Sequence, residues 1–238
     1  MMGRRILIFF CFFLLITSEG FAGEIYWYLA ASMSKPGKEV VTRFNQTSDG
    51  TRVLLIIGGS GQLLSKIELA RKGGIYSPAS ASFLEKAQAK GLVKQHRLLL
   101  YQTPVFGLSK SGQTRVQTFN DLQRPGIQLA LGNPKTMALG ASYLKIEKKM
   151  GSGLSGRIRL NSRLQAINIS QIVNYLRADI VDAGLIFDSV ARANQLEYVE
   201  IPAEYNFQNA AFLIRLDFPV ANDSEVAQFE NFIAKHWV

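Results

Sequence analysis

The 238-residue sequence is poor in the residues that build disulfides and metal sites, with one cysteine and two histidines. The cysteine, Cys11, lies in an apolar segment near the N-terminus, so the chain beyond that segment has no thiol. This excludes disulfides, cysteine metal ligands and cysteine nucleophiles there. No two histidines share helical spacing and no Asp-rich loop is present. We therefore expect neither a metal site nor a bound cofactor.

Acidic residues are also scarce, because 18 Asp and Glu stand against 27 Lys and Arg, a formal net charge of +9. This excess of positive charge favours an anionic partner but does not identify it. The densest basic group, Lys145, Lys148 and Lys149, has helical spacing and no interleaved aromatic residues. We interpret it as a solvated helix face and expect no nucleic-acid binding.

Long hydrophobic runs are missing except at the N-terminus. Arg4 and Arg5 precede the apolar run 6–16, and Gly20-Phe21-Ala22 places small residues where a signal peptidase reads them. The run is too short to span a bilayer and is typical of a secretory signal peptide. We predict a signal peptide over residues 1–22, cleavage near Ala22, and a monomeric protein in the periplasm.

In the rest of the chain, short apolar strands alternate with helices. Strands are expected at 24–31, 53–57, 127–131 and 183–187, and helices at 36–44, 62–72, 137–150 and 167–176. This alternation predicts an α/β protein with mostly parallel sheets.

Two long extended runs, 98–108 and 207–216, are candidates for paired strands that cross between two lobes. We predict a discontinuous first lobe of residues 23–109 plus 206–238 and a second lobe of residues 110–205. Residues 151–156 fit the pattern G-x-G-x-x-G, but they follow a helix rather than a strand, so we expect a loop instead of a dinucleotide site.

Small and hydroxyl residues follow two predicted strands, as Ala30-Ala31-Ser32 and as Gly58-Gly59-Ser60-Gly61. In parallel α/β sheets, ligands bind beyond the carboxyl ends of strands, where helix N-termini present unpaired N–H donors. Ser32 and Ser60 are therefore candidate anion ligands. The alternative is that both are ordinary helix caps.

Ser60 also suggests a secreted hydrolase, because residues 58–62 approach the G-x-S-x-G pattern of a serine nucleophile. Gln62 stands where that pattern needs glycine, and neither His96 nor His236 is placed in sequence to act as its base. We therefore expect no enzyme activity and no catalytic residues.

Over nearly the whole chain beyond residue 22, the sequence resembles the periplasmic molybdate-binding proteins of ABC importers. The motifs that carry the likeness are Tyr28–Ser32, Gly58–Leu63, Thr103–Lys110, Gly132–Pro134, Asn168-Ile169, Asp182–Phe187 and Ile201–Asn206. The resemblance implies the two-lobed periplasmic binding protein fold of type II, with two crossing hinge strands. It also implies that the lobes close on a tetrahedral oxyanion, molybdate or tungstate, for delivery to a membrane permease.

The resemblance further implies the ligand-binding residues. Ser32 and Ser60 would donate from the first lobe, and the backbone N–H groups of Leu139 and Ile169 from the second. Phe187 stands where the family commonly has a tyrosine hydroxyl, and Leu139 where it usually has a smaller residue. Because these two differences alter the second lobe's half of the pocket, the alternative is a different oxyanion or a small organic anion, bound by an importer component or a sensor.

Overall fold

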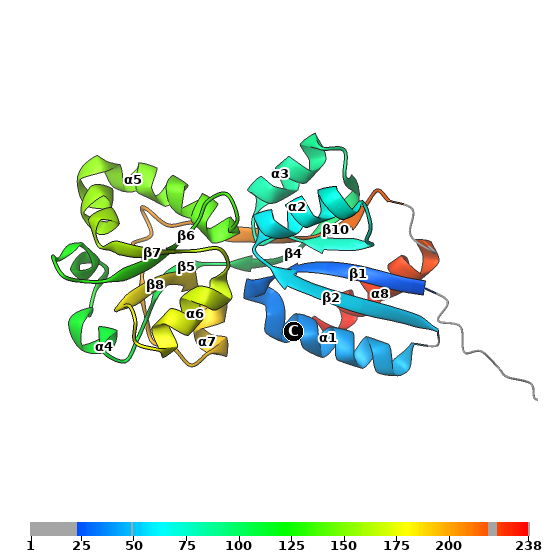
Figure 1. Cartoon of the computed structure of the whole chain (residues 1–238), viewed down its shortest axis with the longest axis horizontal. Helices are drawn as coiled ribbons and strands as arrows, with labels where there is room; N and C mark the ends of the chain where they lie inside the picture. The colour runs from blue at the N-terminus through cyan, green and yellow to red at the C-terminus, as the bar shows by residue number, and fades with distance from the viewer. Residues whose placement is uncertain (1–22, 49, 219–222, 238) are drawn as a thin grey trace, which may run out of the picture.

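A computed structural model describes residues 23–48, 50–218 and 223–237, and the predicted signal peptide 1–22 lies outside them. Within these residues the strands form two five-stranded sheets that lie side by side, each flanked by helices (Figure 1). We call the sheet that contains the N-terminal strand, with its helices, the first lobe, and the other sheet with its helices the second lobe.

The first lobe contains both ends of the described chain. Its elements are β1 (Gly23–Ala30), a 3-10 turn η1 (Ala31–Met33), α1 (Ser34–Thr47), β2 (Thr51–Gly58), α2 (Ser60–Ala70), β3 (Ile75–Ser77), α3 (Ala81–Ala89), β4 (Val93–Gln102), β10 (Asn209–Leu216) and α8 (Asp223–His236). The strand order is β2-β1-β3-β10-β4. Strand β1 pairs in parallel with β2 and β3, whereas β10 pairs antiparallel with β3 and β4. Only β10 therefore runs against the other four strands of this sheet.

The second lobe repeats this plan. Its elements are β5 (Pro104–Leu108), α4 (Gly112–Arg115), a 3-10 turn η2 (Phe119–Gln123), β6 (Leu129–Gly132), α5 (Ala138–Leu160), β7 (Ser162–Ala166), α6 (Ile169–Arg177), β8 (Ala183–Phe187), α7 (Asp188–Ala193) and β9 (Tyr198–Glu200). The order is β7-β6-β8-β5-β9, and β5 is the strand that opposes its four neighbours in direction. The predicted pair of α/β lobes with mostly parallel sheets is confirmed.

The chain changes sheet between β4 and β5. The predicted run 98–108 is divided at Thr103, since β4 pairs with β10 in the first sheet and β5 pairs with β8 and β9 in the second. The sequence predicted that the first part of the first lobe extends to residue 109. This boundary is wrong, because Pro104–Leu108 belongs to the second sheet. Extended apolar residues have the same pattern whichever sheet they join, so the sequence could not place this change.

The predicted loop at 151–156 is wrong. Helix α5 continues to Leu160, with a break at Gly151, whose φ of 74° lies in the left-handed region that glycine adopts easily. Helical structure resumes beyond the break, where the Ser155 hydroxyl donates to the Gly151 carbonyl at 2.7 Å. Ile158 is fully buried in this second segment. Packing of Ile158 thus outweighs the low helix propensity of the glycines.

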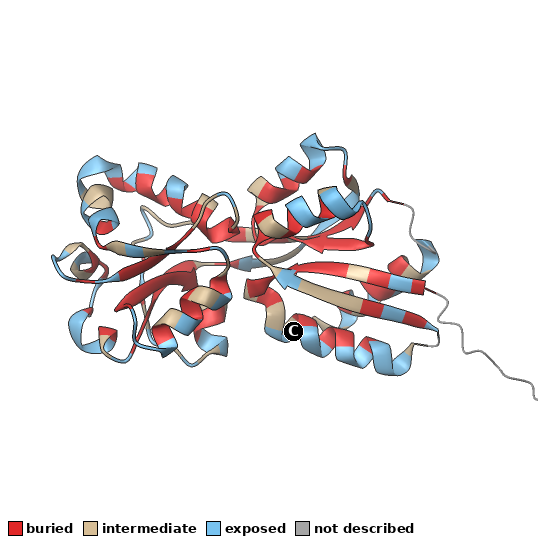
Figure 2. Ribbon diagram, in the orientation of Figure 1, coloured by how far each residue is buried: buried red, intermediate tan, exposed pale blue. Residues whose placement is uncertain are grey.

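Buried residues lie mainly on the strands and on the sides of the helices that face the sheets (Figure 2), and they form the hydrophobic core. In the first lobe, Trp27 of β1 is fully buried, and its indole N–H donates to the Ser77 hydroxyl at 2.9 Å. Phe229 of α8 packs edge-on against Trp27, with ring centroids 5.4 Å apart, and lies 4.8 Å from Phe44 of α1. Helix α8 therefore ties the C-terminal part of the chain to the core of the first lobe.

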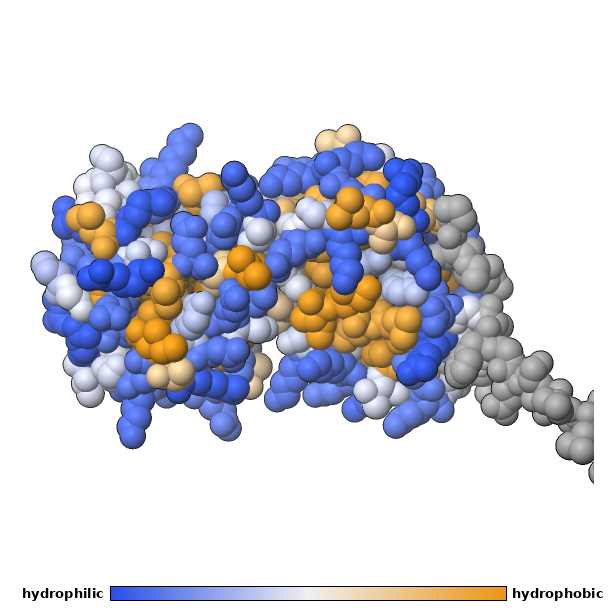
Figure 3. All heavy atoms as spheres, viewed as in Figure 1, coloured by the Kyte–Doolittle hydropathy of each residue, from blue (hydrophilic) through white to orange (hydrophobic). Residues whose placement is uncertain are grey.

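The surface in Figure 3 is largely hydrophilic, with a hydrophobic area over β2. This strand is at the edge of the first sheet, and Ile57 on it is 36% exposed. An edge strand has a neighbour on one side only, which leaves its side chains partly uncovered. Within the described ranges, no helix combines the length and apolar character needed to cross a membrane.

Truncating Phe229 tests the role of α8. The variant Phe229→Ala should lower the free energy of unfolding by about 3–5 kcal/mol, because a fully buried ring is replaced by a cavity. Leu69→Ala is the control, because Leu69 on α2 is 88% exposed and its truncation should change stability by less than about 0.5 kcal/mol. Urea denaturation followed by circular dichroism measures both, and equal effects would contradict this packing.

Candidate functional site

A small cavity lies between the lobes, where strands of both sheets end. Three strands of the first lobe, β1, β2 and β3, and three of the second, β6, β7 and β8, have their carboxyl ends at or near its wall. Ligands of α/β sheets bind at this end of the strands. The cavity has a volume of about 20 Å³. One water molecule needs roughly 10–15 Å³ by the same measure, so the space suits a small ion.

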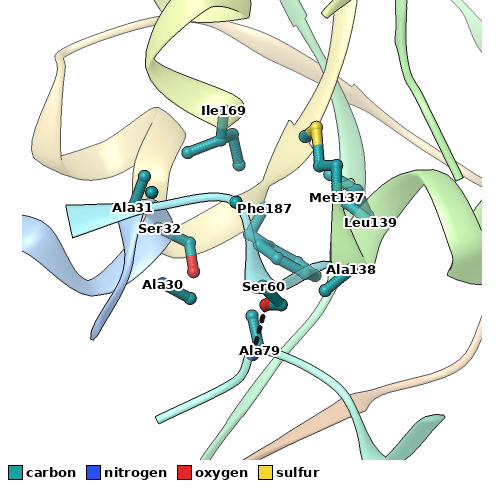
Figure 4. Close-up of a pocket in the computed structure, with 12 residues that line it drawn as sticks. Ala30, Ala31, Ser32, Ser60, Ala79, Met137, Ala138, Leu139, Ile169 and Phe187 are labelled. Atoms are coloured by element: carbon teal, nitrogen blue, oxygen red, sulfur yellow. Dashed lines mark hydrogen bonds between the residues drawn. The ribbon is translucent and has the colours of Figure 1, made fainter. Parts of the chain in front are cut away.

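The structure brings the five predicted site residues together around this cavity. Residues Ser32 and Ser60 line it from the first lobe, and Leu139, Ile169 and Phe187 line it from the second. Figure 4 shows the two serine oxygens on one side, across from the Ile169 and Met137 side chains. Binding of an oxyanion by these residues stays a prediction.

Ser60 is the first residue of α2, and the N-cap is Gly59, so the alternative that Ser60 is an ordinary helix cap is wrong. Its buried hydroxyl oxygen instead accepts a hydrogen bond from the Ala79 N–H at 3.1 Å (Figure 4). This leaves the hydroxyl proton available for donation into the cavity. The Tyr76 hydroxyl donates to the Ser60 carbonyl at 2.8 Å. Burial raises the pKa of Tyr76 well above its usual value, so this donor stays protonated.

Ser32 lies in η1, directly after β1, and its side chain does not cap a helix either. Its hydroxyl oxygen is buried and has no hydrogen-bond partner among the described residues. A buried polar group without a partner costs about 1–3 kcal/mol. A ligand oxygen in the cavity would remove that cost, so this unpaired hydroxyl points to a polar occupant.

Three α-helices begin at the cavity. Ser60 opens α2, Leu139 is the second residue of α5, and Ile169 is the first residue of α6. The first N–H groups of a helix have no carbonyl partner within it, and the helix dipole adds partial positive charge at that end. Three such ends around one small space would favour an anion over a cation or a neutral group.

The described residues that line the cavity carry no charge. Lys35, three residues after Ser32 in the sequence, is exposed and lines a neighbouring groove. Phe187 and Leu139, each 1% exposed, contribute apolar wall, and the phenyl ring of Phe187 offers no hydrogen-bond donor. In the part of the chain that the structure describes, no three His, Cys, Asp or Glu side chains group as a metal site would require.

The hydrolase alternative needs a base beside Ser60. His236 stacks on Phe232 at a centroid distance of 4.0 Å, and His96 lies 6.1 Å from the Phe212 ring. Neither histidine is among the residues that line the cavity. Gln62, which departs from the nucleophile pattern, closes the turn through its side-chain oxygen, which accepts from the Gly59 N–H at 3.0 Å.

The sequence missed several contributors to the site. Ala79 follows β3, a strand of only three residues that the apolar pattern did not reveal. Met137 and Ala138 precede Leu139 at the start of α5 and also line the cavity. The sequence feature that could have indicated them is the Gly132–Pro134 turn. Such a turn precedes a helix, whose first N–H groups have no partner within the helix.

The chain is similar in sequence to known binding proteins and similar in fold to solved structures. The molybdate-binding protein ModA of Mycobacterium bovis is 22% identical over 184 residues, which cover 76% of this chain and 68% of that protein. The periplasmic molybdate-binding protein of Azotobacter vinelandii matches with a TM-score of 0.72 at 16% identity, covering 90% of this chain and 93% of that one. The sulfate-binding protein SubI of Mycobacterium tuberculosis matches with a TM-score of 0.74 at 14% identity, covering 88% and 81%.

These comparisons confirm the resemblance to periplasmic molybdate-binding proteins that the sequence indicated. The structural likenesses fall below 25% identity and show the fold alone. Residues 25–235 match the family described as bacterial extracellular solute-binding protein. Since this match spans almost all described residues, the chain belongs to the family of bacterial extracellular solute-binding proteins.

Proposed function

We propose that the protein captures a tetrahedral oxyanion between its lobes, with molybdate or tungstate the expected ligand, and delivers it to the permease of an ABC-type importer. The observation that carries the proposal is the buried Ser32 hydroxyl, which has no partner among the described residues and lies in a cavity where three helices begin. The cavity volume of about 20 Å³ agrees with a small ion. Solute capture requires no chemical step, so no catalytic residue or cofactor is needed.

Selectivity follows from the kind of donors present. Hydroxyl and N–H groups donate to every oxygen of a fully deprotonated oxyanion. A protonated anion brings a hydrogen that needs an acceptor, and a site made of donors leaves that hydrogen unpaired. Neutral donors without a charged side chain therefore favour dianions over protonated species.

The ligands named for the relatives support the same class. Molybdate and sulfate are both tetrahedral oxyanions, and they are the ligands in the names of the two relatives from Mycobacterium. Membership of an extracellular solute-binding family supports export. The signal peptide with cleavage near Ala22 and action in the periplasm as a monomer are parts of the same proposal. The permease would contact both lobes and receive the ion when they open.

A second candidate is a small organic anion, bound as an importer component or as a sensor. The groove that borders the cavity favours it, because Ser32 lines both spaces. The groove measures about 550 Å³ and is also lined by Lys35 and by the buried Gln102, whose side-chain nitrogen has no partner among the described residues. An organic substituent would have to reach this groove past Ser32.

Calorimetric titration with molybdate, tungstate, sulfate and phosphate tests the proposal. We expect at least one dianion to bind with a dissociation constant in the micromolar range or below, and molybdate and tungstate to bind alike. Heat from a small organic anion alone would favour the second candidate. Absence of heat with all four inorganic ions would contradict the proposed function.

The variant Ser32→Ala tests the unpaired hydroxyl. Loss of one hydrogen bond to a charged ligand, worth about 1.5–3 kcal/mol, should weaken binding by roughly 10- to 100-fold. The free energy of unfolding should not fall, because this hydroxyl has no partner among the described residues. The double variant Ser32→Ala/Ser60→Ala should lose measurable binding while remaining folded. Unchanged affinity in the double variant would refute the site.

The pH dependence of binding tests the neutral character of the site. The described lining residues have no ionisable side chain, so the affinity for sulfate should stay constant between about pH 6 and pH 9. Phosphate, which gains a proton over this range, should bind more weakly as the pH falls. A sulfate affinity that rises steeply below about pH 6.5 would instead require a histidine cation at the site.

A further inference from the structure

The glycine-rich turn between β2 and α2 brings the main chains of the two lobes into direct contact. The Gly61 N–H, in the first turn of α2, donates to the Thr136 carbonyl of the second lobe at 2.9 Å. A Cβ atom added at Gly61 would lie 2.2 Å from the Lys135 carbonyl oxygen. One added at Gly59 would lie 2.4 Å from the Thr136 oxygen and 2.5 Å from the Ile167 oxygen.

These contacts are too short for any side chain. The atoms that a methyl group would meet are backbone atoms of the second lobe, just before α5 and α6, and they cannot rotate away as a side chain can. Relief of a 2.2 Å contact to an ordinary separation needs a shift of roughly 1 Å. The shift would have to come from the lobes or from the segment 133–137.

The local structure offers no other reason for glycine at position 61. Within a helix, alanine is more favourable than glycine. Gly61 does not line the cavity, and its φ does not fall in the left-handed region. The close approach to the Lys135 and Thr136 main chain is therefore the feature of this structure that a side chain at this position would disturb.

We infer that Gly61, supported by Gly59, is a specificity-determining position, because main-chain contact at this turn sets how far the lobes close and so limits the size of the ligand. The inference rests on the proposed function. Donors on the two lobes reach one small anion only if the lobes approach to hydrogen-bonding distance, about 2.7–3.2 Å from its oxygens. A methyl group at Gly61 holds the lobes apart, which lengthens bonds to a small ion and admits a larger anion.

The test compares Gly61→Ala with the parent protein and with Gly153→Ala. Gly153 lies on α5 away from the cavity, and a Cβ there would meet only the tip of the Arg157 side chain, at 3.8 Å. Both variants replace a helical glycine by alanine, so they match in their effect on helix propensity. Calorimetry with molybdate and with phenylphosphonate compares a small and a larger anion, and thermal unfolding checks the fold.

Lobe closure is measured in the same variants with spin labels. Leu69→Cys on α2 and Leu160→Cys on α5 provide exposed attachment points, one on each lobe. The sequence has no cysteine beyond Cys11, which lies in the predicted signal peptide, so labelling of the secreted form is specific. Pulsed electron resonance then reports the distance between the lobes with and without molybdate.

We expect Gly61→Ala to bind molybdate at least tenfold more weakly than the parent and Gly153→Ala do. Its affinity ratio of phenylphosphonate to molybdate should rise, its lobes should stay farther apart with molybdate, and its unfolding temperature should not fall. Gly59→Ala should behave alike. A Gly61→Ala protein that binds and closes like the parent overturns this inference and leaves the proposed function standing. A parent protein that binds none of molybdate, tungstate, sulfate and phosphate overturns both.

Discussion

Helix N-termini that converge between the lobes present main-chain N–H groups that have no acceptor within their own helices, and the candidate site depends on this constraint. Three parallel strands of each sheet run toward the cavity, and α2, α5 and α6 start there because they follow β2, β6 and β7. The Ser32 and Ser60 hydroxyls add neutral donors to the same space. Helix dipoles and neutral donors favour negative charge, so an anion could bind here although no lysine or arginine is among the described residues that line the cavity.

The same turn that presents Ser60 also holds the lobes together. Gly59 and Gly61 flank Ser60, and their missing side chains let the backbone of α2 reach the Thr136 and Ile167 carbonyls. The lobe contact and the ligand contact that we propose for Ser60 thus belong to neighbouring residues of one turn. If the protein binds an ion as proposed, closure of the lobes and enclosure of the ion would be a single event, because both require the close approach of this turn.

Much of this arrangement could be read from the sequence. Apolar strands followed by Ser32 and Ser60 predicted the first lobe's half of the site, because strand ends and helix starts are local features. Leu139 and Ile169 came only from the family resemblance, since a backbone donor has no side-chain signature. The three-residue strand β3, the sheet change at Thr103 and the continuation of α5 past Gly151 depend on tertiary packing, which no local pattern records. The contact of Gly61 with Thr136 joins residues 75 positions apart and could not be predicted at all.

A crystal structure of the protein grown with tungstate would show where the oxyanion binds, because anomalous scattering locates the heavy atom without assumptions about its ligands. We expect one strong peak in the interlobe cavity. The ion's oxygens should lie about 2.7–3.2 Å from the Ser32 and Ser60 hydroxyls and from the N–H groups of Leu139 and Ile169. A peak beside Lys35 in the neighbouring groove, or a cavity without a peak at saturating tungstate, would contradict oxyanion binding between the lobes.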